Sequence, residues 1–438
     1  MKNYLLIFTA AFIFVNADAQ NNETLLPDSS SIISPIHKKS FNNDGECPVR
    51  KQGGNTRMIN GYQVFDGSMD GDRQVDPQIA VGGGYILEAS NRGLIIYDKK
   101  GNFINGVSQK CFNNGIDPKL AFDIHDKVFL FDMWWYYDKA KEKPVNISVS
   151  ETSNPNGAWN IYPVSRKEEV DGGAIGYSKK WIAYSYPGGS ENAFVLKMSD
   201  AKAGKPATVY FFKGNIGEPV MTQDDVDDLY FFSINDSEFI VRKISEGTDG
   251  KPYCTTVSKG LHHFQYIDYP PESPQKGTAQ KISSGDRNPK NLILQNGCIW
   301  FSQAVNCNGR SAVQWSQLSL SKNKFLQTGL IKSDTTNYIQ TTIGVNKNND
   351  VLIGFQEANE HSFVSSRFTY RLHKDRKGTT RKIIRIAEGK AAGDGDAWGD
   401  YSGTCIDGDN LANLWTIQSW ANAKGKASSV IIKVPFKK

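Results

Sequence analysis

The 438-residue chain lacks any apolar run long enough to cross a membrane as a helix. The longest run, residues 4–15, is well short of the about 20 residues that a membrane span needs. It follows the basic Lys2 and precedes the Ala-Asp-Ala triplet 17–19, small residues at the spacing of a signal-peptidase site. We therefore expect residues 1–19 to be a signal peptide and the mature protein to be secreted. An uncleaved N-terminal anchor is the alternative.

A strong excess of one charge is also missing. The chain has 51 Lys and Arg against 46 Asp and Glu, a formal net charge of +5. Spread over this length, such a charge gives a weak field, so nucleic acid is not an expected partner. With 39% hydrophobic and 22% charged residues, the chain can fill a core and is not disordered throughout.

Several motifs of common enzymes are absent from the sequence. There is no Cys-x-x-Cys pair, no His-x-x-x-His pair and no Gly-x-Ser-x-Gly elbow. These absences argue against a zinc module, a thioredoxin-like redox site and an α/β-hydrolase. No catalytic residue can be assigned on motif grounds, and whether the protein is an enzyme stays open.

Cysteine is scarce, with six residues, but an even number in an exported chain predicts disulfides. Six cysteines allow 15 pairings. Cys298 and Cys307 are the best local pair, because they flank a strand-like stretch and could clamp a hairpin or its neighbouring loop. Asn22, Asn146 and Asn235 begin glycan acceptor triplets and would carry glycans in a eukaryotic host.

Glycine and aromatic residues are abundant, with 40 Gly, 9 Trp, 18 Tyr and 23 Phe, which favours short strands and tight turns. A unit of strand, short turn and strand recurs seven times. The copies begin at Asp76, Asp117, Asp171, Glu218, Asn288, Ile339 and Asp400. Their spacing of 41 to 70 residues matches blade periods of ~40–50 residues with loop insertions.

Each unit has room for four strands, because further hairpin-like stretches lie between the copies. The sequence therefore predicts an all-β protein, a seven-bladed β-propeller of four-stranded blades. We assign residues 61–438 to the propeller and expect an N-terminal strand near residues 63–65 to close the ring with the C-terminal strand. Residues 20–60 are polar and show no sustained period, so we expect an irregular leader that wraps or dangles.

Two segments carry a resemblance to a known group. Asp-Pro-Gln-Ile-Ala-Val-Gly at 76–82 and Trp-Gly-Asp-Tyr-Ser at 398–402 resemble exported, mostly bacterial propellers called sialidase-like or BNR-like. The likeness covers most of the chain from about Asp76, and since the group is mostly uncharacterised it implies fold and export rather than an activity. The sequence departs from true sialidases, because it has no Ser-x-Asp-x-Gly-x-Thr-Trp box and no arrangement that singles out their arginine trio.

Acidic residues recur at the heads of the inner strands, where a propeller usually binds its ligands. Asp76, Asp117, Asp171 and Asp400 occupy corresponding places in four copies. Carboxylates gathered around one axis repel each other unless they are protonated, hydrogen-bonded to turn amides or bridged by a cation. Ca²⁺ is a candidate cation because it prefers oxygen ligands. The simpler interpretation is that each Asp caps its own turn, and the alternative is a site in which the four residues share a cation, with Ca²⁺ as the candidate, or a ligand.

Aromatic residues that reach solvent are candidates for ligand contact. The candidates are Trp134, Trp135, Tyr136, Tyr137, Trp398 and Tyr401. Four consecutive aromatic residues cannot all point inward from a strand of period two, so part of the 134–137 cluster should be exposed. Exposed rings stack on sugars or anchor a protein partner, whereas the alternative for any single ring is core packing.

These observations predict a monomeric, secreted propeller that binds an extracellular glycan or protein, with calcium as a candidate structural ion. The alternative is a glycoside hydrolase or lyase in which Asp76, Asp117 or Asp400 acts as acid or base. A structural or adhesive matrix protein is a third reading, which a wide apolar surface patch would favour.

Overall fold

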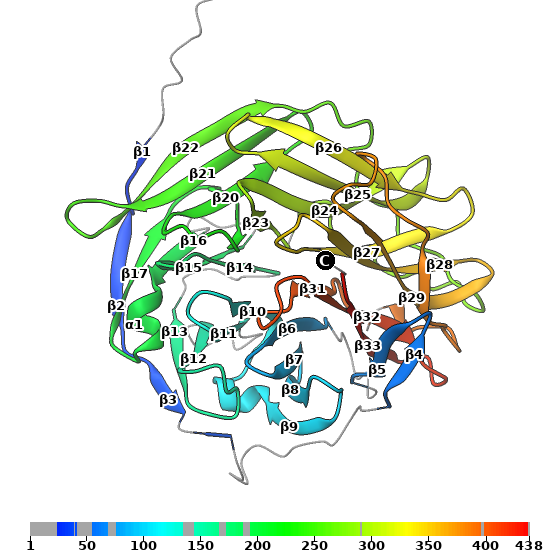
Figure 1. The fold of residues 1–438 in the computed structure, drawn as a ribbon, viewed down its shortest axis with the longest axis horizontal. Helices are drawn as coiled ribbons and strands as arrows, with labels where there is room; N and C mark the ends of the chain where they lie inside the picture. Colours follow the sequence, from blue (N-terminus) through cyan, green and yellow to red (C-terminus); the bar gives the residue numbers. More distant parts are fainter. Residues whose placement is uncertain are drawn as a thin grey trace, which may run out of the picture.

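The structure is a computed structural model that describes residues 24–38, 40–41, 55–68, 76–134, 144–165, 172–186, 193–289, 291–395 and 398–436. These residues form seven antiparallel blades arranged around a central axis (Figure 1). The seven-bladed β-propeller predicted from the sequence is confirmed. The described ranges include one short α-helix, α1 (Met198–Lys202), and the 3-10 turn η1 (Gln109–Phe112).

The first three blades follow chain order, from the inner strand outward. Blade 1 contains β6 (Gln78–Gly82), β7 (Tyr85–Ser90), β8 (Gly93–Asp98) and β9 (Phe103–Ser108). Blade 2 contains β10 (Ile116–Asp123), β11 (Val128–Trp134), β12 (Val145–Ser150) and β13 (Trp159–Val164). Blade 3 contains β14 (Ala174–Tyr177), β15 (Trp181–Ser185), β16 (Ala193–Lys197) and β17 (Ala207–Phe212).

The other four blades complete the ring. Blade 4 contains β18 (Glu218–Pro219), β20 (Leu229–Ile234), β21 (Glu238–Glu246) and β22 (Pro252–Leu261). The short strand β19 (Met221–Thr222) follows β18 and pairs in parallel with β14 of blade 3 and with the inner strand of blade 5. Blade 5 contains β23 (Ile293–Gln295), β24 (Cys298–Cys307), β25 (Arg310–Ser319) and β26 (Lys324–Ile331). Blade 6 contains β27 (Asn337–Val345), β28 (Val351–Asn359), β29 (Ser362–Arg371) and β30 (Ile384–Ala387). Blade 7 contains β31 (Gly403–Ile406), β32 (Leu414–Ala421), β33 (Ala427–Val434) and β5 (Tyr62–Asp66), with β4 (Arg57–Ile59) outside β5.

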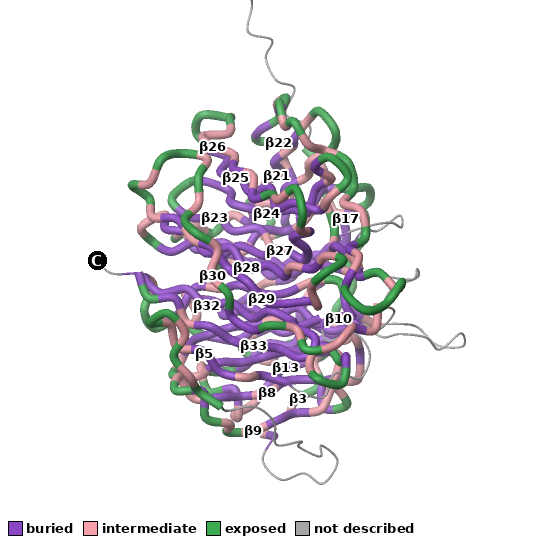
Figure 2. The backbone as a smooth tube through the Cα atoms, turned by 90° about the vertical axis from the view of Figure 1, so that its right-hand side faces the viewer, coloured by how far each residue is buried: buried purple, intermediate pink, exposed green. Residues whose placement is uncertain are grey.

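Hydrophobic side chains fill the spaces between neighbouring blades, and the side view in Figure 2 shows the buried strands stacked through the body of the ring. Strand β15 illustrates the cause, because successive side chains on a strand point to opposite faces. Trp181 and Ala183 pack in a core shared with blade 4, whereas Ile182 and Tyr184 pack in one shared with blade 2. Strand β15 is therefore buried on both faces.

The ring closes between the two ends of the propeller chain. Strand β5 pairs antiparallel with β33, with Val64 opposite Ile432 and Phe65 opposite Ile431. This is the closing strand expected near residues 63–65. It makes blade 7 a composite of N-terminal and C-terminal segments, so neither segment completes the blade alone.

The described part of the leader is regular, which corrects the expectation of an irregular segment. Strands β1 (Thr24–Leu25), β2 (Ser29–Ile33) and β3 (Ile36–Lys38) add a fifth strand to blades 4, 3 and 2, at the outer rim in Figure 1. Their side chains are mostly exposed, so no buried face imposes a hydrophobic period on the sequence. Main-chain pairing holds these strands in place.

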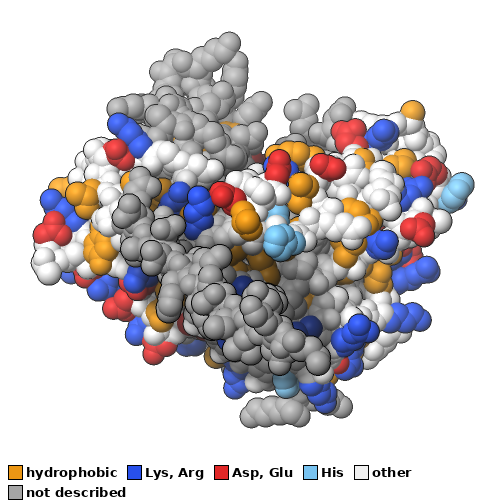
Figure 3. Space-filling model, turned by 90° about the horizontal axis from the view of Figure 1, so that it is seen from above, with side chains coloured by type: hydrophobic (Ala, Val, Ile, Leu, Met, Phe, Trp, Pro, Cys, Tyr) orange, Lys and Arg blue, Asp and Glu red, His pale blue; other side chains and the backbone are white. Residues whose placement is uncertain are grey.

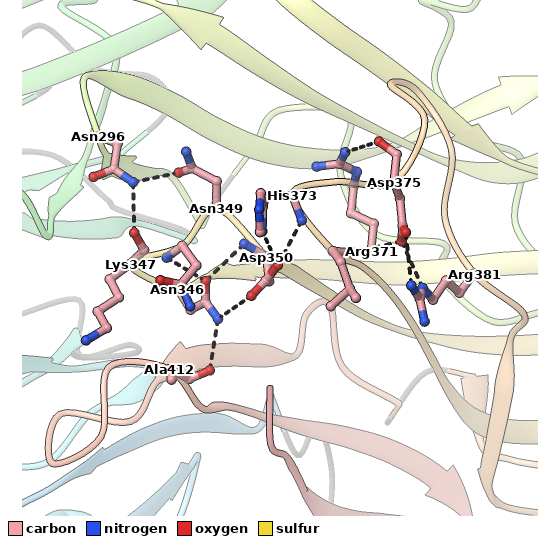
Figure 4. Close-up of polar contacts among 12 residues, drawn as sticks. Asn296, Asn346, Lys347, Asn349, Asp350, Arg371, His373, Asp375, Arg381 and Ala412 are labelled. Atoms are coloured by element: carbon pink, nitrogen blue, oxygen red, sulfur yellow. Dashed lines mark hydrogen bonds and ion pairs between the residues drawn. The ribbon is translucent and has the colours of Figure 1, made fainter. Parts of the chain in front are cut away.

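A network of turns joins the blades at the ends of the inner strands. In Figure 4, the Asn296 amide donates to the Lys347 carbonyl at 3.0 Å and to Asn349 Oδ1 at 2.9 Å. The Asn346 amide donates to Asp350 Oδ2 at 3.0 Å and to the Ala412 carbonyl at 2.9 Å. These contacts connect blades 5, 6 and 7 on the face opposite the strand heads.

The predicted Cys298–Cys307 disulfide is wrong. Both cysteines are free and buried, and they stand at the two ends of the ten-residue strand β24. An extended strand of this length spans about 30 Å, whereas the Cα atoms of a disulfide lie at most about 7 Å apart. Residues 1–19, which we expect to be a signal peptide, lie outside the described residues. No helix in the described part of the chain is long and apolar enough to cross a membrane.

Candidate functional site

A cavity of about 500 Å³ opens on the face where the inner strands begin. Its wall comes mainly from the heads of inner strands and from the long segment between β22 and β23, described over 262–289 and 291–292, which we call the insertion; Ser302 of β24 adds to it. We call this space the channel-mouth cavity. It is lined by Gln78, Asp117, Lys119, Gly172, Tyr269, Ser283, Gly285, Asp286, Asn288, Asn291, Ser302, Gln340, Thr341, Thr342, Asp400, Tyr401 and Ser402.

An unusual backbone conformation recurs at the strand heads. Asp76, Asp117 and Gln340 have φ of 41°, 51° and 49°, in the left-handed region that L-residues rarely adopt. In β10 and β27 these residues lie inside a break of the pairing register, between 116 and 119 and between 339 and 342. Bulges of this kind re-aim side chains next to functional sites. Here the residues after the bulge, including Lys119, line the cavity.

Asp76 is fully buried beneath the cavity. Its Oδ1 accepts a hydrogen bond from the Asp400 backbone N–H at 2.7 Å, and its Oδ2 accepts one from the Asn91 amide at 2.9 Å. Burial, with the nearby Asp117 charge as a second cause, raises the pKa of Asp76 to about 7. This carboxyl therefore titrates near neutral pH.

Asp117 is fixed by contacts on two sides. Its backbone N–H donates to Asn91 Oδ1 at 2.6 Å, and the Trp134 indole N–H donates to its Oδ2 at 3.0 Å. Asn91 thus connects the backbone of Asp117 to the carboxylate of Asp76. Trp134 is buried and holds Asp117 in place, which corrects its prediction as an exposed ligand platform.

Lys119 and Asp132 lie opposite each other on β10 and β11, and both are buried. The Lys119 ammonium lies over the Tyr401 ring, 3.1 Å from its centroid. Burial raises the pKa of Asp132 well above its usual range, and the Lys119 charge only partly opposes this. Burial and the surrounding carboxyls also raise the pKa of the Tyr401 hydroxyl.

We call Asp76, Asp117, Lys119, Asp132 and Tyr401 the floor cluster. Among the described residues, its three carboxyls lie around the Lys119 ammonium in a buried environment, where charge is costly. Interacting groups of this kind titrate as a unit. The floor cluster therefore retains protons near neutral pH, and through Asp117, Lys119 and Tyr401 it reaches the cavity wall.

The predicted calcium site is not formed by the residues that the structure describes. No group of three or more acidic, cysteine or histidine side chains is placed to hold a metal ion in this part of the chain. Asp76, Asp117 and Asp400 are near one another at the strand heads, but the cation among them is the Lys119 ammonium. Asp171 lies outside the described residues.

The aromatic residues predicted to contact a ligand differ in where the structure places them. Trp398 is buried and donates from its indole N–H to Gln356 Oε1 at 2.9 Å, so it too is wrong as an exposed platform. Tyr401 lines the cavity. Trp135, Tyr136 and Tyr137 lie outside the described residues.

The three predicted glycan acceptor positions also differ in their exposure to solvent. Asn146 is fully buried in β12, where its Oδ1 accepts from Asn113 and its amide donates to the Asn114 carbonyl, each at 3.0 Å. This environment leaves no room for a glycan. Asn235 is exposed in the turn between β20 and β21 and stays a prediction, and Asn22 lies outside the described residues.

Lys119, Gln340 and Tyr269 are among the site residues that were not identified from the sequence. Lys119 follows Asp117-Pro118 in the repeated motif, so its position was visible but its charge was not used. Gln340 repeats the backbone of Asp76 and Asp117 without an acidic side chain or a following proline. Tyr269 lies in the insertion, outside the repeat, and no sequence period marks it.

Comparison with known proteins assigns the chain to no family. No protein-family model matches the sequence, and no curated protein matches it. Among solved structures, it is similar to an ulvan lyase of polysaccharide lyase family 25 (8% identity, TM-score 0.42, covering 84% of this chain and 93% of that one). It is also similar to TolB from Acinetobacter baumannii (9% identity, TM-score 0.36, 82% and 80% covered).

A third similar structure is a subtype N10 neuraminidase-like protein from a little yellow-shouldered bat influenza A virus (8% identity, TM-score 0.38, 86% and 98% covered). At these identities each likeness concerns architecture alone. The seven blades observed in the chain itself identify it as a β-propeller.

Proposed function

We propose that this propeller binds an extracellular glycan in the channel-mouth cavity. The observation that carries the proposal is the chemistry of the wall, which consists almost entirely of amide, hydroxyl and carboxyl side chains with two tyrosines. Such groups match the hydroxyls of a sugar. A volume of about 500 Å³ lies in the usual range for ligand sites.

The polar wall is held in place before any ligand binds. The Gln78 amide donates to the Ser402 carbonyl at 3.0 Å, and the Asn291 amide donates to the Ile343 carbonyl at 2.6 Å. The Gln340 amide donates to the Ser283 carbonyl at 3.3 Å, which joins blade 6 to the insertion. Side chains fixed in this way lose little conformational freedom on binding, which favours affinity.

A protein ligand receives less support from the described surface. The large exposed apolar side chains are scattered, with Leu26 and Met58 near the N-terminus and Leu261 at the end of β22. On the face drawn in Figure 3, hydrophobic, basic and acidic side chains are interspersed over the described atoms. A protein-binding or adhesive face would more commonly present a contiguous apolar patch.

An enzyme acting on carbohydrate is the second candidate, and the floor cluster is the observation that favours it. A carboxyl with a pKa of about 7 is poised to donate or accept a proton near neutral pH. Asp76 itself is buried, but Asp117 lies beside it and lines the cavity. Proton transfer to a bound sugar would pass through Asp117.

The test is a glycan array probed with the mature protein and read once for retained protein and once for trimmed sugars. We expect retention, and we expect Asp400→Asn, which changes a carboxylate in the cavity wall, to weaken it at least tenfold. Asp249→Asn, in an exposed turn between β21 and β22, is the matched control and should bind like the wild type.

Trimming of the arrayed sugars would select the enzyme, and Asp117→Asn would then be expected to abolish it. Silence in both readings would overturn glycan binding. Secretion of the protein is part of the same proposal, since it depends on the signal-peptide pattern at residues 1–19. Recovery of the protein from the medium, with an N-terminus at Gln20, is the expected result.

A further inference from the structure

Tyr269 is the exposed aromatic residue of the channel-mouth cavity. Its side chain is 61% exposed, and of the large apolar side chains exposed in the described ranges it is the one that lines this cavity. Tyr401, the other tyrosine of the wall, is covered on one side by Lys119 and has a buried hydroxyl. A solvent-facing ring inside a polar cavity leaves apolar surface in water, which favours a ligand that covers it.

One face of Tyr269 is already occupied. The guanidinium carbon of Arg287 lies 4.6 Å from the ring centroid, over the ring. Arg287 is itself held, because its Nη1 donates to Asp236 Oδ1 and to the Ile267 carbonyl, each at 2.7 Å. The guanidinium therefore fixes the orientation of the ring and leaves the opposite face for a ligand.

The backbone around Tyr269 is anchored to two blades and to the segment between blades 6 and 7. The Asn306 N–H donates to the Asp268 carbonyl at 3.0 Å, one residue from Tyr269, and ties the insertion to blade 5. The Lys276 N–H donates to the Ser362 carbonyl at 3.0 Å in blade 6, and the Gln275 amide donates to the Gly393 carbonyl at 2.8 Å beyond β30. Tyr269 thus stands on a fixed wall.

We propose that Tyr269 is the stacking platform of the glycan site, and that it takes a pyranose ring that presents a face of C–H groups, as in β-linked gluco-configured polysaccharides. This inference rests on the proposed function and names its substrate class. In such rings every hydroxyl is equatorial, so the ring faces are apolar and the edges carry the hydrogen-bonding groups. The Tyr269 ring matches the apolar face of the sugar, and the amides and hydroxyls of the cavity wall match its hydroxyl-bearing edges.

Nucleic acid, which also stacks on aromatic rings, fits this site less well. Asp117, Asp286 and Asp400 line the same cavity, and carboxylates repel a phosphate backbone. Arg287, the cation beside the ring, is engaged with Asp236 at 2.7 Å. Neutral sugars meet no such repulsion.

The experiment titrates cellohexaose and chitohexaose, by calorimetry, into the full-length mature protein and its variants. We expect Tyr269→Ala to weaken binding at least tenfold and Tyr269→Trp to retain it, because tryptophan also offers a flat ring. Arg287→Ala is the variant of the positioning residue, with an intermediate loss expected. Tyr253→Ala, on β22 and outside the cavity wall, is the control and should bind normally.

A spectroscopic readout separates stacking from a merely structural role. On binding, the tryptophan of Tyr269→Trp should shift its emission relative to the same titration of the wild type. Wild-type binding that Tyr269→Ala leaves unchanged would overturn the inference. So would a protein that ignores both hexasaccharides while retaining other glycans on the array, and in that case the proposed function would stand. Silence on the array as well would overturn both.

Discussion

A buried carboxyl such as Asp76 makes stability depend on pH in a direction opposite to that of most surface acids. Its pKa is raised to about 7 in the folded chain, chiefly by burial, from an ordinary value of 3.8. The folded state therefore binds this proton more tightly than the unfolded state. The contribution of Asp76 to stability is greatest at low pH and falls as pH rises from about 4 to about 7.

Asp76→Asn should weaken this dependence. The amide does not titrate, asparagine tolerates the left-handed backbone, and its Oδ1 can still accept from the Asp400 N–H. Between pH 5 and pH 8, we expect the wild type to lose about 2 kcal/mol more in free energy of unfolding than the variant. Urea denaturation at the two pH values measures this difference.

Asp225→Asn is the matched control for this prediction. Asp225 is exposed, and the Lys179 ammonium that hydrogen-bonds to it lowers its pKa, so the sign is reversed and screening by solvent keeps the effect small. An Asp76→Asn variant that follows the wild-type pH dependence would contradict the raised pKa of Asp76.

Sequence reasoning placed Asp76 and Asp117 correctly because the Asp-Pro pair at a strand head repeats. It assigned them a metal because a list of acids contains no information on which cation lies among them. The Lys119 ammonium becomes that cation only when β10 is bulged and paired with β11. Tyr269 could not be predicted, since its exposure depends on how the insertion folds back over the channel.

At the scale of elements, the leader is the least expected feature. Strand β2 pairs with β17 over five residue pairs, although four of its five side chains are exposed. Its contribution comes from main-chain hydrogen bonds and from covering a sheet edge. Uncovered edges are sites for association with other chains.

Deletion of residues 20–38 should therefore lower the melting temperature and increase aggregation. Blades 2, 3 and 4 would expose β13, β17 and β22 at their outer edges, while the ring would still close through β5. Differential scanning calorimetry with light scattering measures both effects. We expect a fall of several degrees.

The control for this deletion replaces the exposed Leu26 and Ile32 by serine and keeps the leader backbone. This variant should melt close to the wild type, because the paired strands remain. A deletion variant that melts and scatters light like the wild type would show that the leader strands do not stabilise the blades.

The strands themselves were largely predictable, because alternating or continuous apolar stretches such as 298–301 indicate strands directly. The contacts that individual side chains make were not. The Cys298–Cys307 prediction failed because the intervening residues continue as one extended strand rather than turning back. The short distance between these two cysteines in the sequence did not indicate the distance between them in the fold.

At the scale of the whole molecule, the boundary between blades 1 and 7 contains a buried acid that secures the closed ring. Glu88 is fully buried and accepts hydrogen bonds from the Tyr97 hydroxyl at 2.8 Å, from the Ser68 backbone N–H at 3.1 Å and from the Ser429 hydroxyl. Burial raises the pKa of Glu88. The residue joins β7 and β8 of blade 1 to β33 of blade 7.

Glu88→Ala should destabilise the propeller by about 3 kcal/mol, because it leaves buried donors without an acceptor. Glu88→Gln keeps a carbonyl oxygen for Ser68 and Ser429 and should cost less. Chemical denaturation of the two variants measures the difference. Equal losses would indicate that side-chain volume, rather than hydrogen bonding, secures this boundary.

The seven blades could be predicted because copies of one unit must stack around a ring, and counting the copies counts the blades. Closure by β5 followed from the need for a partner at the C-terminal strand β33. The cavity could not be predicted, because the insertion that forms one wall has no counterpart in the other copies.

The leader also has a consequence for the order in which the chain assembles. Ribosomes make β1 first, but its partner β22 lies more than 200 residues downstream, and the blades that receive β2 and β3 are likewise made later. During synthesis this segment is therefore exposed to solvent until its partner strands have been made. Its polar, serine-rich composition keeps it soluble during this time, because an apolar strand in the same position would pair with other growing chains. The lack of pattern that hid these strands in the sequence thus suits strands that are made long before their partners.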